Sequence, residues 1–169
     1  LNPILASDAI AGSVLSFVND SLIERDKDTL AFIPKLAKSW EISPNHLTYT
    51  FHLRDDVLWS DGQKVRAEDF EYSWKRLLDP RTASEYAYIL FDIVNAEAYH
   101  GGTIQDSTRV GVNATDDHTL EVRLNHPAPY FLAITTFEVT YPQRRDIVEK
   151  FGRRWTDPEN LVTNGPFRL

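Results

Sequence analysis

The sequence feature that most constrains the fold is a strict alternation of apolar and polar residues in LTYTFHLR, residues 47–54. Side chains alternate between the two faces of a strand, so this pattern predicts a strand with one apolar face. The apolar face is formed by Leu47, Tyr49, Phe51 and Leu53. Turn-forming residues at 43–45 precede the strand, and we therefore expect WEIS and LTYTFHLR to pair as a hairpin.

A second alternating pair predicts another hairpin later in the chain. VGVNAT (110–115) and HTLEVRL (118–124) are joined by two aspartates. The apolar face of the second strand is formed by Leu120, Val122 and Leu124. Between the two hairpins, residues 67–78 have helical spacing, and Asp79-Pro80 ends the predicted helix. The apolar stripe of this helix consists of Ala67, Phe70, Trp74, Leu77 and Leu78.

The remaining segments predict shorter elements. We expect a helix at 9–20 with Asp8 as its N-cap, and an extended segment at 22–33 with a polar turn within it. The further expected elements are a helical turn from Pro34 to Trp40, helical residues at 84–100, a helix after Pro129, a helix at 146–152 and a strand beginning within 163–169. The order of helices and strands shows no regular strand–helix–strand repeat. The predicted fold class is therefore α+β, with a mixed, mainly antiparallel sheet packed by several helices.

Composition excludes several classes of protein. The formal net charge is −7 and the pI is about 5.2, which argues against a nucleic-acid binder, because phosphate binding requires a basic surface. The chain contains no run of about 18 apolar residues, so no membrane-spanning helix is predicted. The absence of cysteine excludes disulfides and thiolate metal sites. Because the chain lacks methionine and opens on Leu1-Asn2-Pro3, we expect a processed or excised piece.

The stretch WSDGQKVRAEDFEYSW, residues 59–74, carries several carboxylates between two tryptophans. It fits either a metal-binding or catalytic loop, or a scaffold. Asp61-Gly62 is similar to part of a calcium loop, but Lys64 and Arg66 stand where that loop needs oxygen ligands. The residues around Gly62 instead match a turn in which glycine adopts a positive φ.

In the scaffold interpretation, Glu68 and Asp69 lie in the first turn of a helix and interact with its free amides. Arg66 precedes this helix without a hydroxyl to cap it, and Asp69 would compensate in part. Trp59 and Trp74 would pack into the core. We therefore interpret the stretch as a turn and a helix held against a sheet.

No arrangement of residues is typical of catalysis. The histidines do not form HxH or HExxH, and no GxSxG, GxGxxG or P-loop sequence is present. His100 is expected to interact with a helix C-terminus. The pairs Asp55/Asp56 and Asp116/Asp117 have no assignable apolar pocket that would raise a carboxyl pKa. We therefore predict no catalytic residue, no metal ligand and no cofactor.

Residues 49–80, YTFHLRDDVLWSDGQKVRAEDFEYSWKRLLDP, resemble the signature segment of the family 5 extracellular solute-binding proteins. This family includes the oligopeptide- and dipeptide-binding components of ABC importers. Further matches are LNP at 1–3, PKLAKSWEIS at 34–43, TASEYAYIL at 82–90, GVNATDDHTLEVRLNHPAPYF at 111–131 and FGRRWTDPENLVTNGPFRL at 151–169. The resemblance covers essentially the whole chain, and TASEYAYIL is similar to the oligopeptide-binding branch.

Members of the family are much longer and have two large lobes that close over a peptide. The resemblance implies that this chain is a partial lobe of such a two-lobed, periplasmic-binding-protein-like fold. Residues 1–19 would be a flanking piece of lobe one, 20–142 the smaller inserted domain, and 143–169 the return into lobe one. The second lobe would supply the other wall of the cleft.

The resemblance also implies ligand-binding residues. In the family, the segment after Leu-Asp-Pro lies along the peptide as a backbone partner, and it falls here on Ser7, Asp8 and Ala9. Oligopeptide binders can carry a glutamate where Ser7 stands, so no charge role is assigned to Ser7, and Asp8 has the alternative role of helix cap. A tyrosine of an SxYA segment also reaches the peptide; here it is Tyr86, for which a core or surface aromatic is the alternative.

The function implied by the resemblance is that of the substrate-binding component of an ABC transporter for oligopeptide uptake, without enzymatic activity. Its partners would be a peptide ligand and ABC permease subunits in the membrane, with no nucleic acid, and the protein would be a monomer. It would be extracytoplasmic, in the periplasm or on the outer face of the cytoplasmic membrane as a lipoprotein. The alternatives are a binder of dipeptides, nickel complexes, haem or sugars, the sensing domain of a regulator with this fold, and a hydrolase that uses Asp/Glu pairs.

Overall fold

The computed structural model describes residues 2–5 and 9–167. The predicted N-cap Asp8 lies outside the described residues. Within them, no helix has the length and apolar character needed to cross a bilayer.

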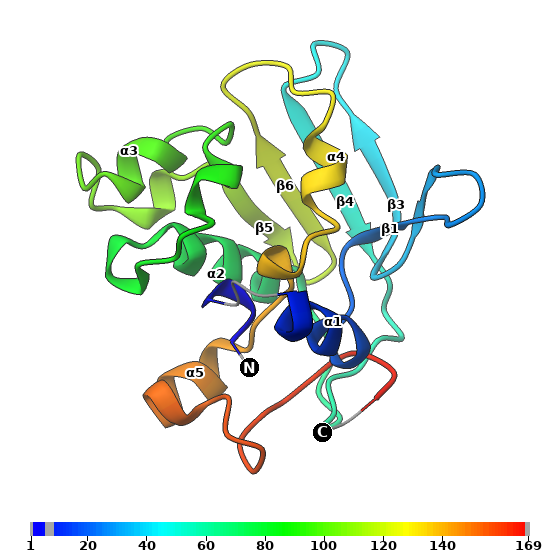
Figure 1. Cartoon of the computed structure of the whole chain (residues 1–169). Helices are drawn as coiled ribbons and strands as arrows, with labels where there is room; N and C mark the ends of the chain where they lie inside the picture. Colours follow the sequence, from blue (N-terminus) through cyan, green and yellow to red (C-terminus); the bar gives the residue numbers. More distant parts are fainter. Residues whose placement is uncertain (1, 6–8, 168–169) are drawn as a thin grey trace.

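A four-stranded antiparallel sheet in the order β3-β4-β6-β5 forms the centre of the fold (Figure 1). Its strands are β3 (Ala37–Ile42), β4 (Thr48–Leu53), β5 (Val112–Asp116) and β6 (Thr119–Arg123). Both predicted hairpins are confirmed, since Trp40 pairs with Phe51 and Ala114 pairs with Leu120. Phe51 also pairs with Leu120, so the two hairpins join into one sheet through β4 and β6. Of the predicted apolar face, Tyr49, Phe51 and Leu53 are buried, whereas Leu47, just before β4, is half-buried.

Helix α2 (Ala67–Leu78) packs against the sheet beside β5 and β6. Its predicted apolar stripe is confirmed, because all five residues of the stripe are fully buried. The Trp74 ring packs edge-on against Phe131 of α4 (Phe131–Ile134), with ring centroids 6.3 Å apart. Its Nε1 donates a hydrogen bond of 2.8 Å to the carbonyl oxygen of Thr140. Trp74 therefore connects α2 to both segments that follow the sheet.

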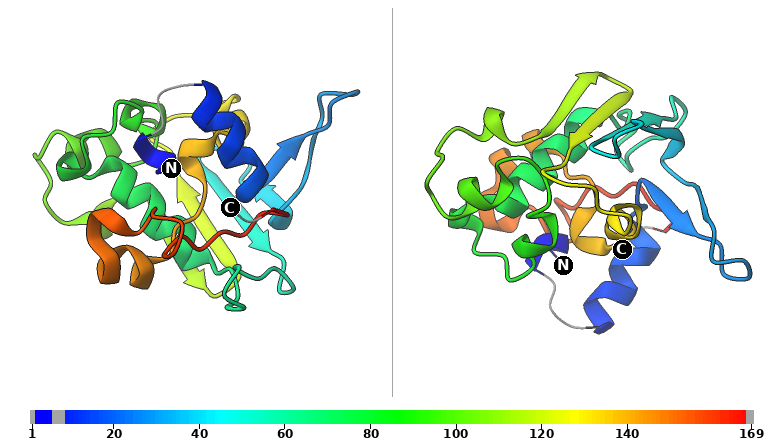
Figure 2. Two further views of the ribbon diagram at one scale, coloured as in Figure 1. Left: turned by 60° about the horizontal axis from the view of Figure 1, so that its bottom comes forward. Right: turned by 90° about the horizontal axis from the view of Figure 1, so that it is seen from above.

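The other helical elements are short. They are α1 (Ala9–Val18), α3 (Ala96–His100), α5 (Arg145–Phe151) and the 3₁₀ turns η1 (Pro3–Leu5), η2 (Pro80–Thr82), η3 (Ala87–Leu90), η4 (Ser107–Arg109), η5 (Glu138–Thr140) and η6 (Gly152–Arg154). A separate hairpin, formed by β1 (Ile23–Arg25) and β2 (Phe32–Pro34), extends away from the main sheet (Figure 2). Helices mixed with antiparallel strands confirm the predicted α+β class.

The predicted helical turn from Pro34 to Trp40 is wrong, because this segment is extended. Pro34 ends β2, and β3 begins at Ala37. β3 is an edge strand that pairs with β4 on one side only, and Trp40 lies opposite Phe51 in that pair. Pairing with β4 satisfies the backbone groups of this segment, and this tertiary interaction outweighs the local helical pattern.

The predicted helical run over 84–100 is also wrong, because only η3 and α3 are helical within it. Ile93 forms an isolated bridge to Leu124, and the N–H of Val94 donates to the last carbonyl oxygen of β6. Asn95 has a φ of 61°, in the left-handed region that a continuous α-helix does not contain. Pairing with the chain beyond β6 therefore interrupts the helix that the composition favours.

The end of α1 lies against residues 165–167. No strand is present in residues 163–167, the described part of the predicted final strand. Instead, the N–H of Gly165 donates to the carbonyl oxygen of Val18 at 2.9 Å, and the N–H of Phe167 donates to that of Phe17 at 3.2 Å. The last segment therefore completes hydrogen bonds at the end of α1. The division into units at 1–19, 20–142 and 143–169 stays a prediction.

We expect Trp74→Phe to destabilise the fold by about 1–3 kcal/mol, because it removes the donor to the buried Thr140 carbonyl and leaves that oxygen unpaired. Urea unfolding of the variant measures the loss. Trp40→Phe is the matched control, since Trp40 is only half-buried and its indole forms no hydrogen bond with the described residues. An equal loss in both variants would show that ring size, and not the hydrogen bond, sets the effect.

Candidate functional site

The predicted site residues belong to two segments. Residues 1–19 are called the N-terminal segment, and residues 84–90, which include η3, are called the Tyr86 segment. Ser7 and Asp8 lie outside the described residues, and Ala9 is the first residue of α1. Tyr86 directly precedes η3 and is half-buried against the core.

A buried serine joins these two segments. The hydroxyl of Ser84 donates a short hydrogen bond to the carbonyl oxygen of Ile4 in η1. The same hydroxyl accepts a bond from the N–H of Tyr86 at 3.4 Å. Ser84 therefore fixes the start of the Tyr86 segment against η1, a few residues before Ala9 along the chain.

Tyr86 is neither a core residue nor a fully exposed one. Its ring is stacked with that of Tyr88, with centroids 6.4 Å apart and an interplanar angle of 28°. Tyr88 is 61% exposed, so the pair presents aromatic surface to solvent while Tyr86 stays anchored. Sequence reasoning missed Tyr88, because it falls in the run that was predicted to be helical.

Two further apolar side chains on neighbouring elements are exposed. Leu5 of η1 is 49% exposed, and Phe137, which precedes η5, is 53% exposed. The turns η1 and η5 are in contact, and η5 also contacts α1. Sequence reasoning missed both residues, because single exposed apolar residues are ordinary and only the fold brings them to neighbouring elements.

Exposed aromatic and aliphatic side chains such as Tyr88, Leu5 and Phe137 can cover apolar groups of a ligand. Within the described residues, no three His, Asp or Glu side chains gather in a way that could hold a metal ion.

The carboxylates of residues 59–74 stabilise the scaffold. Oδ2 of Asp69 accepts hydrogen bonds from the backbone N–H of Arg66 at 2.9 Å and from Nε1 of Trp59 at 3.0 Å. Burial raises the pKa of the Asp69 carboxyl to about 6, although both donors favour its ionised form. The predicted capping role of Asp69 and the predicted burial of Trp59 are confirmed.

Asp61 and His100 also form structural contacts within the fold. Oδ1 of Asp61 accepts a bond from the N–H of Gln63 within the predicted turn, and Gly62 there has a φ of 87°. Oδ2 of Asp61 lies 3.1 Å from Nη1 of Arg144. Nδ1 of His100 lies 3.1 Å from the carbonyl oxygen of the last residue of α2, as the predicted helix C-terminal role requires.

A charged groove of about 890 Å³ runs along α2, beside α5. Its charged side chains pair with one another: Glu71 lies 2.6 Å from Lys75, and Arg144 lies 2.7 Å from Asp146. None of the residues that line it belongs to the two segments of the predicted site. The groove therefore does not serve as the site that those segments form.

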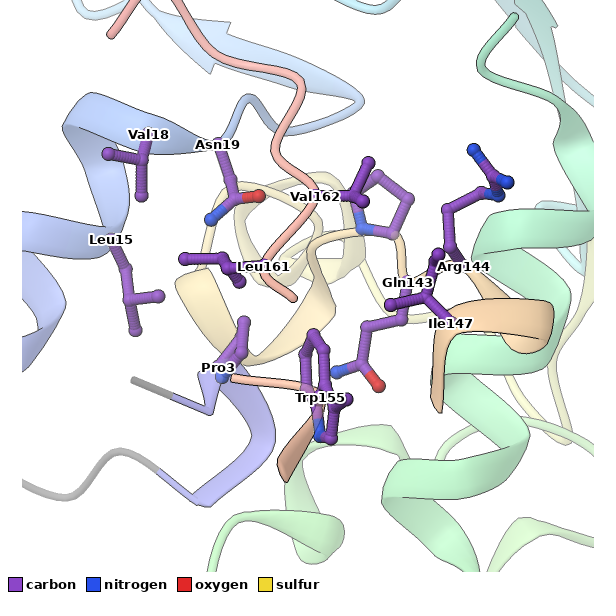
Figure 3. A pocket seen from close by; sticks show the side chains of 11 residues that line it. Pro3, Leu15, Val18, Asn19, Gln143, Arg144, Ile147, Trp155, Leu161 and Val162 are labelled. Carbon is purple, nitrogen blue, oxygen red and sulfur yellow. The ribbon is translucent and has the colours of Figure 1, made fainter. Parts of the chain in front are cut away.

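A small pocket lies where the N-terminal segment meets residues 142–162 (Figure 3). Most of its walls are apolar, and Leu15 and Trp155 are among them. Oε1 of Gln143 accepts a bond from Nη1 of Arg76 at 2.8 Å, while its buried Nε2 has no partner among the described residues. The space is that of about one water molecule, so it cannot hold a larger solute.

Comparison with known proteins identifies a family. The sequence model of the bacterial extracellular solute-binding proteins, family 5 Middle, matches residues 31–169. The chain is 46% identical over 138 residues to the periplasmic oligopeptide-binding protein OppA of Salmonella typhimurium, a match that covers 80% of this chain and 25% of that protein.

Solved structures show the same architecture. The substrate-binding domain of an oligopeptide ABC transporter from Bacillus anthracis superposes with a TM-score of 0.94 at 40% identity, over 99% of this chain and 32% of that one. OppA of Haemophilus influenzae, solved in complex with RPPGFSPFR, gives a TM-score of 0.93 at 35% identity, over 99% of this chain and 33% of that one. The chain thus spans a quarter to a third of the length of these proteins.

We expect Asp69→Asn to change how stability depends on pH. The folded-state pKa of about 6 lies above the ordinary value of 3.8, so the folded chain binds this proton more tightly than the unfolded chain. The contribution of Asp69 is therefore most favourable below pH 4 and falls as the pH rises to about 6, by about 3 kcal/mol. Asparagine does not titrate.

Urea unfolding of both proteins between pH 4 and pH 7.5 measures this change. The difference in unfolding free energy between the parent chain and Asp69→Asn should become more favourable to the parent as the pH falls. The opposite trend would mean that the hydrogen bonds from Arg66 and Trp59 lower the pKa of Asp69 by more than burial raises it. The ionised carboxylate would then be the preferred form in the folded chain.

Proposed function

This chain belongs to the bacterial extracellular solute-binding proteins of family 5, and from that membership we propose that it is part of the peptide-binding component of an ABC importer. One observation supports the position of the site: the bond from Ser84 to Ile4 joins the Tyr86 segment to the N-terminal segment. The relative from Haemophilus influenzae that holds a peptide in its solved complex supports the class of ligand.

In the proposed mechanism, the peptide binds in extended form beside residues 7–9. Main-chain hydrogen bonds to this segment give affinity without selecting side chains, which suits a carrier of varied peptides. The Tyr86–Tyr88 pair and the exposed Phe137 cover apolar groups of the peptide. No covalent bond is made or broken, and a second lobe outside this chain closes over the ligand.

The proposal includes an arrangement of parts. Residues 1–19 and 143–169 belong to lobe one, and residues 20–142 form a smaller domain inserted into it. The hydrogen bond from Gly165 to Val18 supports grouping the first and last pieces together. The protein acts as a monomer outside the cytoplasm, in the periplasm or as a lipoprotein on the outer face of the membrane, and delivers peptides to the permease subunits.

Calorimetric titration tests whether this chain supplies one wall of a two-walled cleft. The 169-residue chain alone should bind a mixture of tri- to pentapeptides weakly or not at all, because the other wall of the proposed cleft is missing. The full-length protein that contains it should bind the same mixture with a Kd of about 1 μM or below. Micromolar binding by the 169-residue chain alone would contradict the two-walled cleft.

Substitution of the aromatic pair tests the site itself. In the full-length protein, Tyr86→Ala and Tyr88→Ala should each weaken peptide binding by about fivefold to tenfold, because each removes aromatic surface that covers the ligand. Leu58→Ala is the matched control, since Leu58 is 51% exposed on the segment before α2, away from both site segments. Unchanged affinity in both tyrosine variants would remove this pair from the site.

A further inference from the structure

A carboxylate lies directly against the backbone of α1. A Cβ atom added to Gly12 would lie 2.7 Å from Oε1 of Glu138, closer than such atoms approach in real proteins. Any other residue at position 12 would therefore displace the carboxylate or distort the helix. Glycine weakens a helix relative to alanine, so α1 gives up helical stability at the point where Glu138 contacts it.

No ion pair or hydrogen bond neutralises the charge of Glu138 within residues 2–5 and 9–167, where its side chain is half-buried. Burial is the main cause that raises the pKa of Tyr141 to about 12, and the negative charges of Glu138 and Asp20 raise it further. Asp20 itself is paired with Lys35. A cation that balances Glu138 has to come from outside the described part of the chain.

Glu138 lies beside the proposed peptide path. It is the first residue of η5, which contacts both η1 and α1. Ala9, the last residue of the predicted backbone partner, lies one helical turn before Gly12. Leu5 and Phe137, both about half exposed, provide apolar surface on the neighbouring elements.

Resting on the proposed function, we propose that Glu138 selects peptides that carry a lysine or arginine side chain. The ammonium or guanidinium group pairs with the Glu138 carboxylate, and its methylene groups lie on the apolar surface of Phe137 and Leu5. Gly12 is the positioning residue, because its missing side chain lets the carboxylate lie against α1. The site is thus selective by charge at one position of the peptide and tolerant at the others.

Calorimetry with matched peptides tests this selection in the full-length protein. Tetra-alanine is compared with variants that place lysine, or its uncharged analogue norleucine, at each position in turn. At one position, the lysine peptide should bind about threefold to tenfold more tightly than the norleucine peptide at low salt, and the preference should shrink in 0.5 M NaCl.

Glu138→Gln should abolish the preference for lysine while leaving the affinity for norleucine peptides unchanged. Gly12→Ala should reduce the preference too, because the added methyl group displaces the carboxylate. Glu97→Gln is the matched control: Glu97 is an exposed glutamate on α3 without an ion pair in the described residues, and this change should have no effect. Unfolding curves show that each variant is folded.

Each other outcome overturns the proposal in a different way. Equal binding of lysine and norleucine peptides at all positions would show that Glu138 does not select cations. An equal loss for all peptides in Glu138→Gln would show that the carboxylate recognises a group common to them, such as the terminal ammonium. A full-length protein that binds none of the peptides would contradict the proposed function itself.

Discussion

The burial of Trp74 is the interaction on which the candidate site depends. Its ring contacts Phe131, and its indole N–H bonds to Thr140, the last residue of η5. The helix that covers the sheet is thereby connected to the turn that lies against the N-terminal segment. Large aromatic burial combined with one buried hydrogen bond holds η5 in place, and η5 in turn sets where Phe137 and Glu138 are presented.

Elements whose pattern is local are predictable from the sequence. The alternation of residues 47–54 and the helical stripe of 67–78 each carry the information for their own conformation, and both agree with the structure. The segments at 34–40 and 84–100 are not predictable in this way, because their conformation is set by partners elsewhere in the sheet. Trp40 is extended because Phe51 lies opposite, which no local window of sequence contains.

The residues of the candidate site also differ in whether a local sequence pattern could identify them. Resemblance to a family singles out Tyr86, since its motif is contiguous in the sequence. Leu5, Tyr88 and Phe137 emerge only when the fold brings η1, η3 and η5 into one region. The close approach of Glu138 to Gly12 cannot be predicted from the sequence. The two residues are far apart in the chain, and only the fold brings them into contact. Contacts between residues that are far apart in the sequence could not be predicted from the sequence alone.

The hydrogen bonds between residues 17–20 and residues 164–167 have a consequence for the order of folding. Asp20 and Asn164 are separated by 144 positions, yet the backbone of one bonds to the side chain of the other. Closing so long a loop is entropically unfavourable until the intervening sheet has formed and shortened it. During synthesis, α1 therefore lacks these hydrogen bonds until the strands between have assembled and residues 164–167 have left the ribosome.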